Sequence, residues 1–160
     1  FNKLFVKYAE QYGRFDDRTE ANIATLLPKA QIAARKAMIA AKALGGGLTV
    51  QILSGTRTYA EQNKLFAQRP KVTNAKAGQS NHNFGIAFDV GIFKGKTYYT
   101  GYTKAQEQAY INLSKLIIPA TGLDWGGLWK SITDYPHYEL KTGRSVRQIR
   151  ALLEAGKAYV

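Results

Sequence analysis

The chain has 160 residues, 45% hydrophobic and 21% charged, which is long enough for one domain with its own core and too short for two. It contains no cysteine, which excludes disulfides, thiolate nucleophiles and cysteine-ligated zinc and leaves imidazole and carboxylate groups to bind any metal. Its 23 Lys and Arg against 11 Asp and Glu give a net charge of +12, which favours an anionic wall or membrane surface, with nucleic acid and mere solubility as equal alternatives.

No stretch approaches the roughly 18 continuous apolar residues that cross a bilayer, and no secretory signal opens the chain. Because no initiator methionine is present, we expect a processed or trimmed piece of a longer product, which leaves export open.

The first third of the chain predicts a leader, a long helix and a strand. Residues 1–20 mix aromatic and charged residues without a clean period, so we treat them as a leader of uncertain structure, and residues 16–19 resemble a turn. Pro28 suits the first turn of a helix, and apolar residues then recur at three- and four-residue spacing until three glycines at 45–47 end the run. Alternation over 48–54 predicts a strand.

A second, shorter helix is predicted directly after this strand. Thr58 as the N-cap and Glu61 three residues later form a capping box. The buried face of this helix would comprise Tyr59, Leu65 and Phe66. Residues 69–81 are rich in Pro, Asn, Gly, Gln and Ser, and predict a loop that leads to His82.

The next segment alternates strictly and predicts a strand with two unlike faces. One face carries large apolar side chains: Phe84, Ile86, Phe88, Val90 and Ile92. The other face is nearly bare apart from a single carboxylate, with Gly85, Ala87, Asp89 and Gly91. Such a face is expected where a metal and a substrate must approach the sheet closely.

The remaining elements complete an α+β pattern. Glycines and aromatics at 95–101 predict a turn region, followed by a helix over about 103–120. An aromatic, glycine-rich loop at 125–129 precedes a short strand at 137–140. A last helix over 145–156 would turn four residues inward: Val146, Ile149, Leu152 and Leu153. We therefore predict a single α+β domain over residues 1–160, with a small, mostly antiparallel sheet flanked by helices.

The chain's only two histidines lie in segments that could hold a metal. His82 precedes Asp89 on the bare strand face, and His137 follows Asp134 by three residues. A catalytic zinc site needs three protein ligands and an open position for water. A solvated histidine and a lysine-paired aspartate are the ordinary alternative, but Asp89 has no obvious structural partner and is costly to bury unpaired.

Two further residues have a chemical and an ordinary interpretation. Asp134 could be a turn residue before Pro136, or a base within reach of a metal-activated water. Arg57 could be a surface arginine, or a fixed cation aimed at a developing oxyanion or a substrate carboxylate. Gln62, about one helical turn beyond Arg57, could orient either group.

Three motifs occur in order between about Asn22 and Leu140. They are Ser-Gly-x-Arg-Thr at 54–58 with Glu-Gln at 61–62, Ser-x-His-x-x-Gly-x-Ala-x-Asp at 80–89, and Trp-Gly-Gly followed by Asp-x-Pro-His within 125–137. This set resembles the zinc peptidoglycan peptidases related to the D-Ala-D-Ala metallopeptidases, and is most similar to their L-alanyl-D-glutamate endopeptidase branch, which includes phage endolysins.

The resemblance implies roles for particular residues. Zinc would be bound by His82, Asp89 and His137, with Asp134 as the catalytic base and Arg57 stabilising the transition state. Substrate contacts are expected from Ser80, Gln62 and Trp125, although core packing is an equal alternative for Trp125 and for Trp129.

The implied activity is bacteriolytic hydrolysis of the L-Ala–D-Glu bond of bacterial peptidoglycan. Related D,D-carboxypeptidases and D,D-dipeptidases usually carry Glu where this chain has Asp134, which favours the endopeptidase. The alternatives are a D,D- or L,D-carboxypeptidase, a non-catalytic wall-binding domain and, last, a nucleic-acid binder. We expect a monomer that acts in the periplasm or cell wall without binding nucleic acid. Since no wall-binding module is recognisable, wall affinity would depend on the basic surface or on a segment outside these residues.

Overall fold

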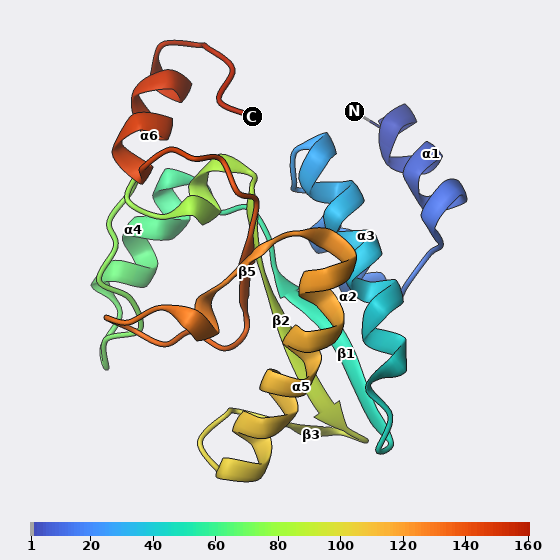
Figure 1. Ribbon diagram of the computed structural model, residues 1–160. Helices are drawn as coiled ribbons and strands as arrows, with labels where there is room; N and C mark the ends of the chain where they lie inside the picture. Colours follow the sequence, from blue (N-terminus) through green and yellow to red (C-terminus); the bar gives the residue numbers. More distant parts are fainter. Residues whose placement is uncertain (1) are drawn as a thin grey trace.

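A computed structural model describes the backbone of residues 2–160 and the side chains of residues 6–160 (Figure 1). Its helices are α1 (Asn2–Tyr12), α2 (Asp17–Ile23), α3 (Pro28–Ala41), α4 (Tyr59–Ala67), α5 (Lys104–Thr121) and α6 (Val146–Glu154). Short 3₁₀ turns occur at η1 (Lys42–Leu44), η2 (Asn81–Phe84) and η3 (Gly126–Leu128). The strands are β1 (Leu48–Ser54), β2 (Ala87–Lys94), β3 (Thr97–Tyr98), β4 (Asp124–Trp125) and β5 (His137–Glu139).

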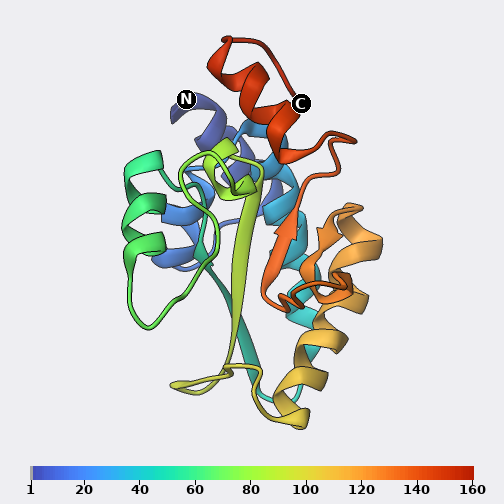
Figure 2. The same cartoon turned by 90° about the vertical axis from the view of Figure 1, so that its left-hand side faces the viewer.

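The strands form one small antiparallel sheet. Its order is β1-β2-β5-β4, and β3 pairs with β2 outside this path. Helices α3 and α5 pack on each other over one side of the sheet, whereas Figure 2 shows α4 on the other side of β2 from α5. The predicted α+β class, with a small antiparallel sheet and flanking helices, is therefore confirmed.

The main core lies between the sheet and the pair α3 and α5. Apolar side chains from β2 (Phe88, Val90 and Ile92) meet the alanine-rich face of α3 and Leu113 and Ile117 of α5. A second cluster, made by Phe84, Ile86, Ile149 and Tyr159, attaches α6 to the start of β2. Both clusters leave the opposite face of β2 around Asp89 free for the polar groups described below.

The N-terminal segment, whose structure the sequence left open, forms helices α1 and α2. Residues 16–19, expected as a turn, begin a helix: the Asp16 carboxylate accepts a hydrogen bond from the backbone N–H of Thr19, which is the N-cap geometry of α2. Arg35 of α3 is fully buried, and its guanidinium binds both carboxylate oxygens of Glu20 at 2.9 and 2.8 Å and donates to the Gly13 carbonyl. This ion pair joins α2 and the end of α1 to the core helix.

The strand around Asp89 begins later than predicted. Phe84 lies in η2, and Gly85 adopts a left-handed conformation with φ of 71°, so β2 begins only at Ala87. Two of the bare positions also have a packing reason. A Cβ at Gly85 would meet the Leu27 side chain, and one at Gly91 would meet Leu53, so these glycines accommodate neighbouring leucines rather than a ligand.

Other elements match closely, with two corrections. The predicted strand 48–54 and the helix that starts at Pro28 occur as expected, and Thr58 with Glu61 forms the predicted capping box of α4. The buried residue of α4 is polar Gln62, whereas the predicted inward residues Tyr59, Leu65 and Phe66 are only partly buried. The two-residue strand β3 lies in the region predicted as a turn. In the part of the chain that the structure describes, no helix has both the length and the apolarity to span a bilayer.

Candidate metal centre

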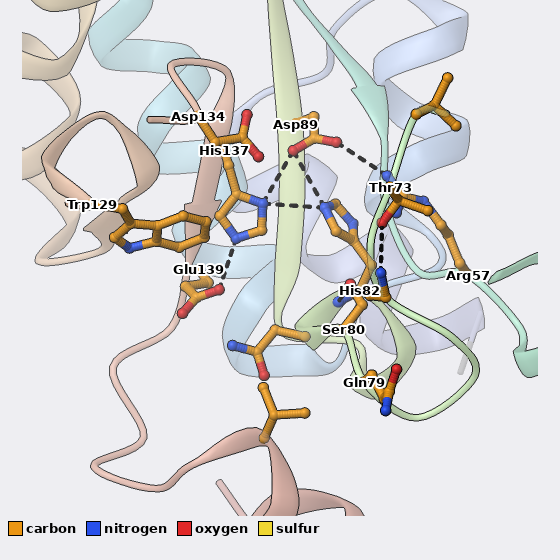
Figure 3. Close-up of a pocket in the computed structure, with 14 residues that line it drawn as sticks. Arg57, Thr73, Gln79, Ser80, His82, Asp89, Trp129, Asp134, His137 and Glu139 are labelled. Carbon is orange, nitrogen blue, oxygen red and sulfur yellow. Dashed lines mark hydrogen bonds and ion pairs between the residues drawn. The ribbon is translucent and has the colours of Figure 1, made fainter. Parts of the chain in front are cut away.

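Three side chains from three separate elements converge on one point. His82 comes from η2, Asp89 from β2 and His137 from β5. His82 Nε2, Asp89 Oδ1 and His137 Nδ1 form a triangle in which each pair of atoms is 3.2 Å apart (Figure 3). The structure thus brings together the three residues that the sequence singled out.

The size of this triangle fits a metal ion. Ligand atoms that surround a tetrahedral zinc at 2.0–2.1 Å lie about 3.3 Å from one another, by simple geometry. The observed spacing of 3.2 Å needs almost no rearrangement to match it. Two imidazoles and one carboxylate also leave a fourth tetrahedral position free, as in catalytic rather than structural sites.

The two histidines are oriented by different partners on the side away from the triangle. His82 Nδ1 lies 2.8 Å from the carbonyl oxygen of Gly55, and His137 Nε2 lies 2.7 Å from Glu139 Oε2. Such partners fix the ring and the tautomer, so that the other nitrogen presents its lone pair to a metal. Glu139 was not predicted from the sequence. The period of two in a strand places it on the same face as His137, and this parity could have revealed it.

Asp89 is held at its second oxygen. Its Oδ2 accepts a hydrogen bond from the Ser54 hydroxyl at 2.7 Å and a longer one from the Arg57 guanidinium at 3.3 Å. Burial opposes ionisation of this carboxyl, but His82 and His137 outweigh burial and hold its pKa well below the usual range. Asp89 is therefore an ionised, oriented carboxylate.

The surroundings of His137 favour a positive charge. Burial alone would lower its pKa, but hydrogen bonds to Asp89 and Glu139 raise the pKa of His137 to about 9. The same two carboxylates would stabilise a metal cation next to this ring just as they stabilise a proton on it.

Asp134 lines the cavity beside the triangle, on the loop between η3 and β5. Its backbone is fixed by hydrogen bonds from its N–H to the Gly126 carbonyl and from the His137 N–H to its own carbonyl. A Cβ at Gly126 would collide with the Asp134 carbonyl, which explains the first glycine in the Trp-Gly-Gly motif. Burial, followed by the charge of Asp89, raises the pKa of Asp134.

Arg57 lines the same cavity, and Gln62 holds it in place. Gln62 is fully buried, and its Oε1 lies 3.4 Å from the Arg57 guanidinium while its Nε2 donates to the Ala75 carbonyl at 2.8 Å. Gln62 therefore connects the arginine to the loop that borders the cavity. Asn83, which sequence analysis did not single out, adds to this by donating to the Arg57 carbonyl and accepting from the Gly78 N–H.

One open cavity of about 600 Å³ is bordered by the three residues of the triangle and by Arg57, Asp134 and Glu139. Ser80 lines it and also caps η2, because its hydroxyl accepts a hydrogen bond from the His82 N–H. Of the two tryptophans, Trp129 lines the cavity with its ring 4.8 Å from that of His137. Trp125 is instead buried in the core, donates to the Tyr135 carbonyl and does not line this cavity.

The comparisons with known proteins agree with this geometry. Residues 73–140 match the family model described as D-alanyl-D-alanine carboxypeptidase, a range that contains His82, Asp89, Asp134 and His137. Over this range the chain is similar to that family. Peptidases of that family are metallopeptidases, and the His82, Asp89 and His137 group of this chain could bind a metal.

Two individual proteins extend the likeness. The chain is 34% identical over 113 residues to the peptidoglycan L-alanyl-D-glutamate endopeptidase CwlK of Bacillus subtilis; the match covers 62% of this chain and spans 65% of CwlK. Its fold is similar to the crystal structure of the Serratia marcescens L-Ala D-Glu endopeptidase ChiX, with a TM-score of 0.60 and 22% identity over 84% of this chain and 94% of ChiX.

Proposed function

We propose that this protein is a zinc-dependent endopeptidase that cleaves the L-Ala–D-Glu bond in the stem peptide of bacterial peptidoglycan. The observation that carries the proposal is the 3.2 Å triangle of His82, Asp89 and His137, open to a cavity that also contains Asp134 and Arg57. The choice of bond is supported by the names of CwlK and ChiX, both L-Ala–D-Glu endopeptidases.

The ligands would be His82 Nε2, Asp89 Oδ1 and His137 Nδ1, an imidazole and carboxylate set that suits zinc. When bound, zinc would polarise the scissile carbonyl and lower the pKa of water enough for it to lose a proton and attack at neutral pH. His82 and His137 donate hydrogen bonds to the Gly55 carbonyl and the Glu139 carboxylate, and Asp89 accepts one from the Ser54 hydroxyl. These contacts keep the three metal-binding atoms in place.

Asp134 would act as the general base and then as the general acid. Its carboxylate has no hydrogen-bond partner among the described residues, and its backbone is fixed beside the triangle. A carboxylate oxygen of Asp134 would accept a proton from the attacking water and later give it to the nitrogen of the leaving D-Glu.

Arg57 would stabilise the negative charge that develops on the carbonyl oxygen. Its guanidinium lines the cavity, is anchored by Gln62 and keeps donors beyond those used by Asp89. A donor fixed before the reaction costs no reorganisation as the charge forms. Gln62 would thus position Arg57 rather than touch substrate.

A carboxypeptidase that trims terminal D-Ala is the second candidate, because the matching family model bears that description. The two activities differ in their products: the endopeptidase creates a new D-Glu amino terminus, whereas the carboxypeptidase releases free D-Ala. The proposed substrate implies that the protein acts at the cell wall. The net charge of +12 would attract the chain to an anionic wall.

The metal proposal is tested by His82→Ala. We expect this variant to lose both zinc retention and the ability to clear a suspension of purified cell wall, and we expect a chelator to have the same effect on the wild type. A His82→Ala protein that still lyses wall without zinc would contradict the proposal. A wild type that retains zinc but never clears wall would favour a non-catalytic wall-binding domain.

A further inference from the structure

The cavity at the metal centre continues past Asp134 into a second hollow. This hollow, of about 500 Å³, shares Val72, Thr73, Ala75, Trp129 and Asp134 with the first. It lies between two loops, the 68–80 loop after α4 and the 129–136 loop before β5. Beyond the shared residues its lining adds Lys71, Asn74, Ser131 and Ile132. The two hollows form one cleft, with the triangle of His82, Asp89 and His137 in the first hollow and Lys71 in the second.

The position of Asp134 assigns a direction to this cleft. In the proposed reaction Asp134 gives its proton to the leaving amine, so the leaving nitrogen must lie within hydrogen-bond reach of its carboxylate. Asp134 is also the acidic residue that lines both hollows. The segment that departs with this amine therefore extends into the second hollow. The segment on the carbonyl side of the cleaved bond then lies at the other end of the first hollow, where Gln79, Ser80 and Asn81 offer neutral polar groups.

The leaving segment and the second hollow have matching chemistry. The segment begins with D-Glu, whose chain continues through one of its two carboxyl groups, so the other carboxylate stays free next to a short methylene stem. Lys71 and Arg57 are the Lys or Arg side chains among the described lining of the two hollows, and Arg57 is engaged with Asp89. Val72 and Ile132, one on each loop, are 55% and 60% exposed and could cover the methylene groups.

We propose that Lys71 is a specificity-determining residue that binds a carboxylate of the leaving peptide, on the D-Glu side of the cleaved bond. This inference rests on the proposed endopeptidase function. The cation is partly oriented already, because the Lys71 ammonium lies 5.7 Å from the centre of the Phe66 ring. An exposed pair of this kind contributes modestly, so Lys71 would select substrates rather than carry catalysis.

The chain contains a matched control for Lys71. Lys76 lies on the same loop and also contacts Phe66, with its ammonium 5.2 Å from the ring centre. It does not line either hollow. Lys71→Ala and Lys76→Ala therefore remove the same charge from the same ring, and only the first removes it from the cleft. A general effect of net charge would change both variants equally.

The test measures how well the zinc-loaded protein cleaves each of two synthetic peptides. One is acetyl-L-Ala–γ-D-Glu–L-Lys, and the other is the same peptide with its carboxylates converted to carboxamides. We expect the wild type to cleave the carboxylate peptide with a kcat/KM up to about fivefold higher, mainly through KM, since exposed ion pairs contribute at most about that factor. Lys71→Ala should abolish this preference, whereas Lys76→Ala and Lys71→Arg should keep it.

Each outcome has one meaning. A preference that survives in Lys71→Ala, or that falls equally in Lys71→Ala and Lys76→Ala, would overturn the assignment of Lys71 while leaving the endopeptidase intact. A wild type that cleaves neither peptide would instead refute the proposed function, and the assignment would fall with it.

Discussion

Asp89 and His137 are directly opposite each other on the neighbouring antiparallel strands β2 and β5. Ser54, which binds the second oxygen of Asp89, is opposite Asp89 on the other side, on β1. Three adjacent strands thus place one metal-binding carboxylate, one metal-binding imidazole and one supporting hydroxyl in a row. Because backbone pairing fixes this row, the proposed metal site is formed by the sheet itself, and His82 adds the third donor from η2.

Glu139→Gln should weaken metal binding without changing the ligands. The carboxylate of Glu139 orients His137 and makes it more basic, and an amide keeps the shape but loses the charge. We expect zinc affinity, measured by competition with a chromogenic chelator, to fall about 10- to 100-fold. Glu154→Gln, which alters an exposed carboxylate paired with Arg150, is the control and should bind zinc like the wild type. Equal affinity in Glu139→Gln would show that Glu139 does not support the site.

Asp134→Asn separates the base from the metal ligands. The amide has nearly the same size but cannot accept a proton, so kcat should fall about 10²- to 10⁴-fold while the zinc content stays at the wild-type level. Asp124→Asn, at a half-exposed carboxylate outside the cleft, should leave both quantities unchanged. Loss of zinc from Asp134→Asn would mean that Asp134 is a ligand rather than a proton carrier.

The buried pair Glu20–Arg35 predicts how stability depends on pH. Burial opposes ionisation of Glu20, but hydrogen bonds from Arg35 and from the Phe15 N–H prevail and lower the pKa of Glu20 below its value of 4.5 in an unfolded chain. The pair therefore contributes fully above about pH 4.5, and the contribution is lost as the pH falls through the lower pKa of the folded state.

Glu20→Gln should accordingly destabilise the fold at neutral pH by about 3 kcal/mol, because the buried Arg35 loses the carboxylate that offsets its charge. Urea unfolding at a series of pH values measures the effect. The difference between wild type and variant should shrink as the pH falls below the pKa of Glu20, and a difference independent of pH would contradict this explanation.

The elements that the sequence predicted well depend on local chemistry. The Thr58 capping box, Pro28 at the start of α3 and the alternation over 48–54 all concern residues a few positions apart. The side of the strand on which Asp89 lies was predictable for the same reason, since parity along a strand is a local property.

The features that the sequence did not predict depend on distant contacts. The Phe84–Ile92 alternation looked like one strand, but Leu27 packs against Gly85 and divides it into η2 and β2. Gln62 is buried because Arg57 and the Ala75 carbonyl satisfy its amide, which no helical pattern reveals. The pairing of Asp89 with His137 joins residues 48 positions apart, so only the folded sheet shows it.

Mass spectrometry of muropeptides from purified cell wall tests the central claim most directly. After digestion with the zinc-loaded protein, we expect stem peptides with a new D-Glu amino terminus and glycan strands that carry a single L-Ala where a stem peptide was attached. We expect neither product with His82→Ala. Release of D-Ala without a new D-Glu amino terminus would identify a carboxypeptidase instead, and an unchanged muropeptide profile would contradict the proposed activity altogether.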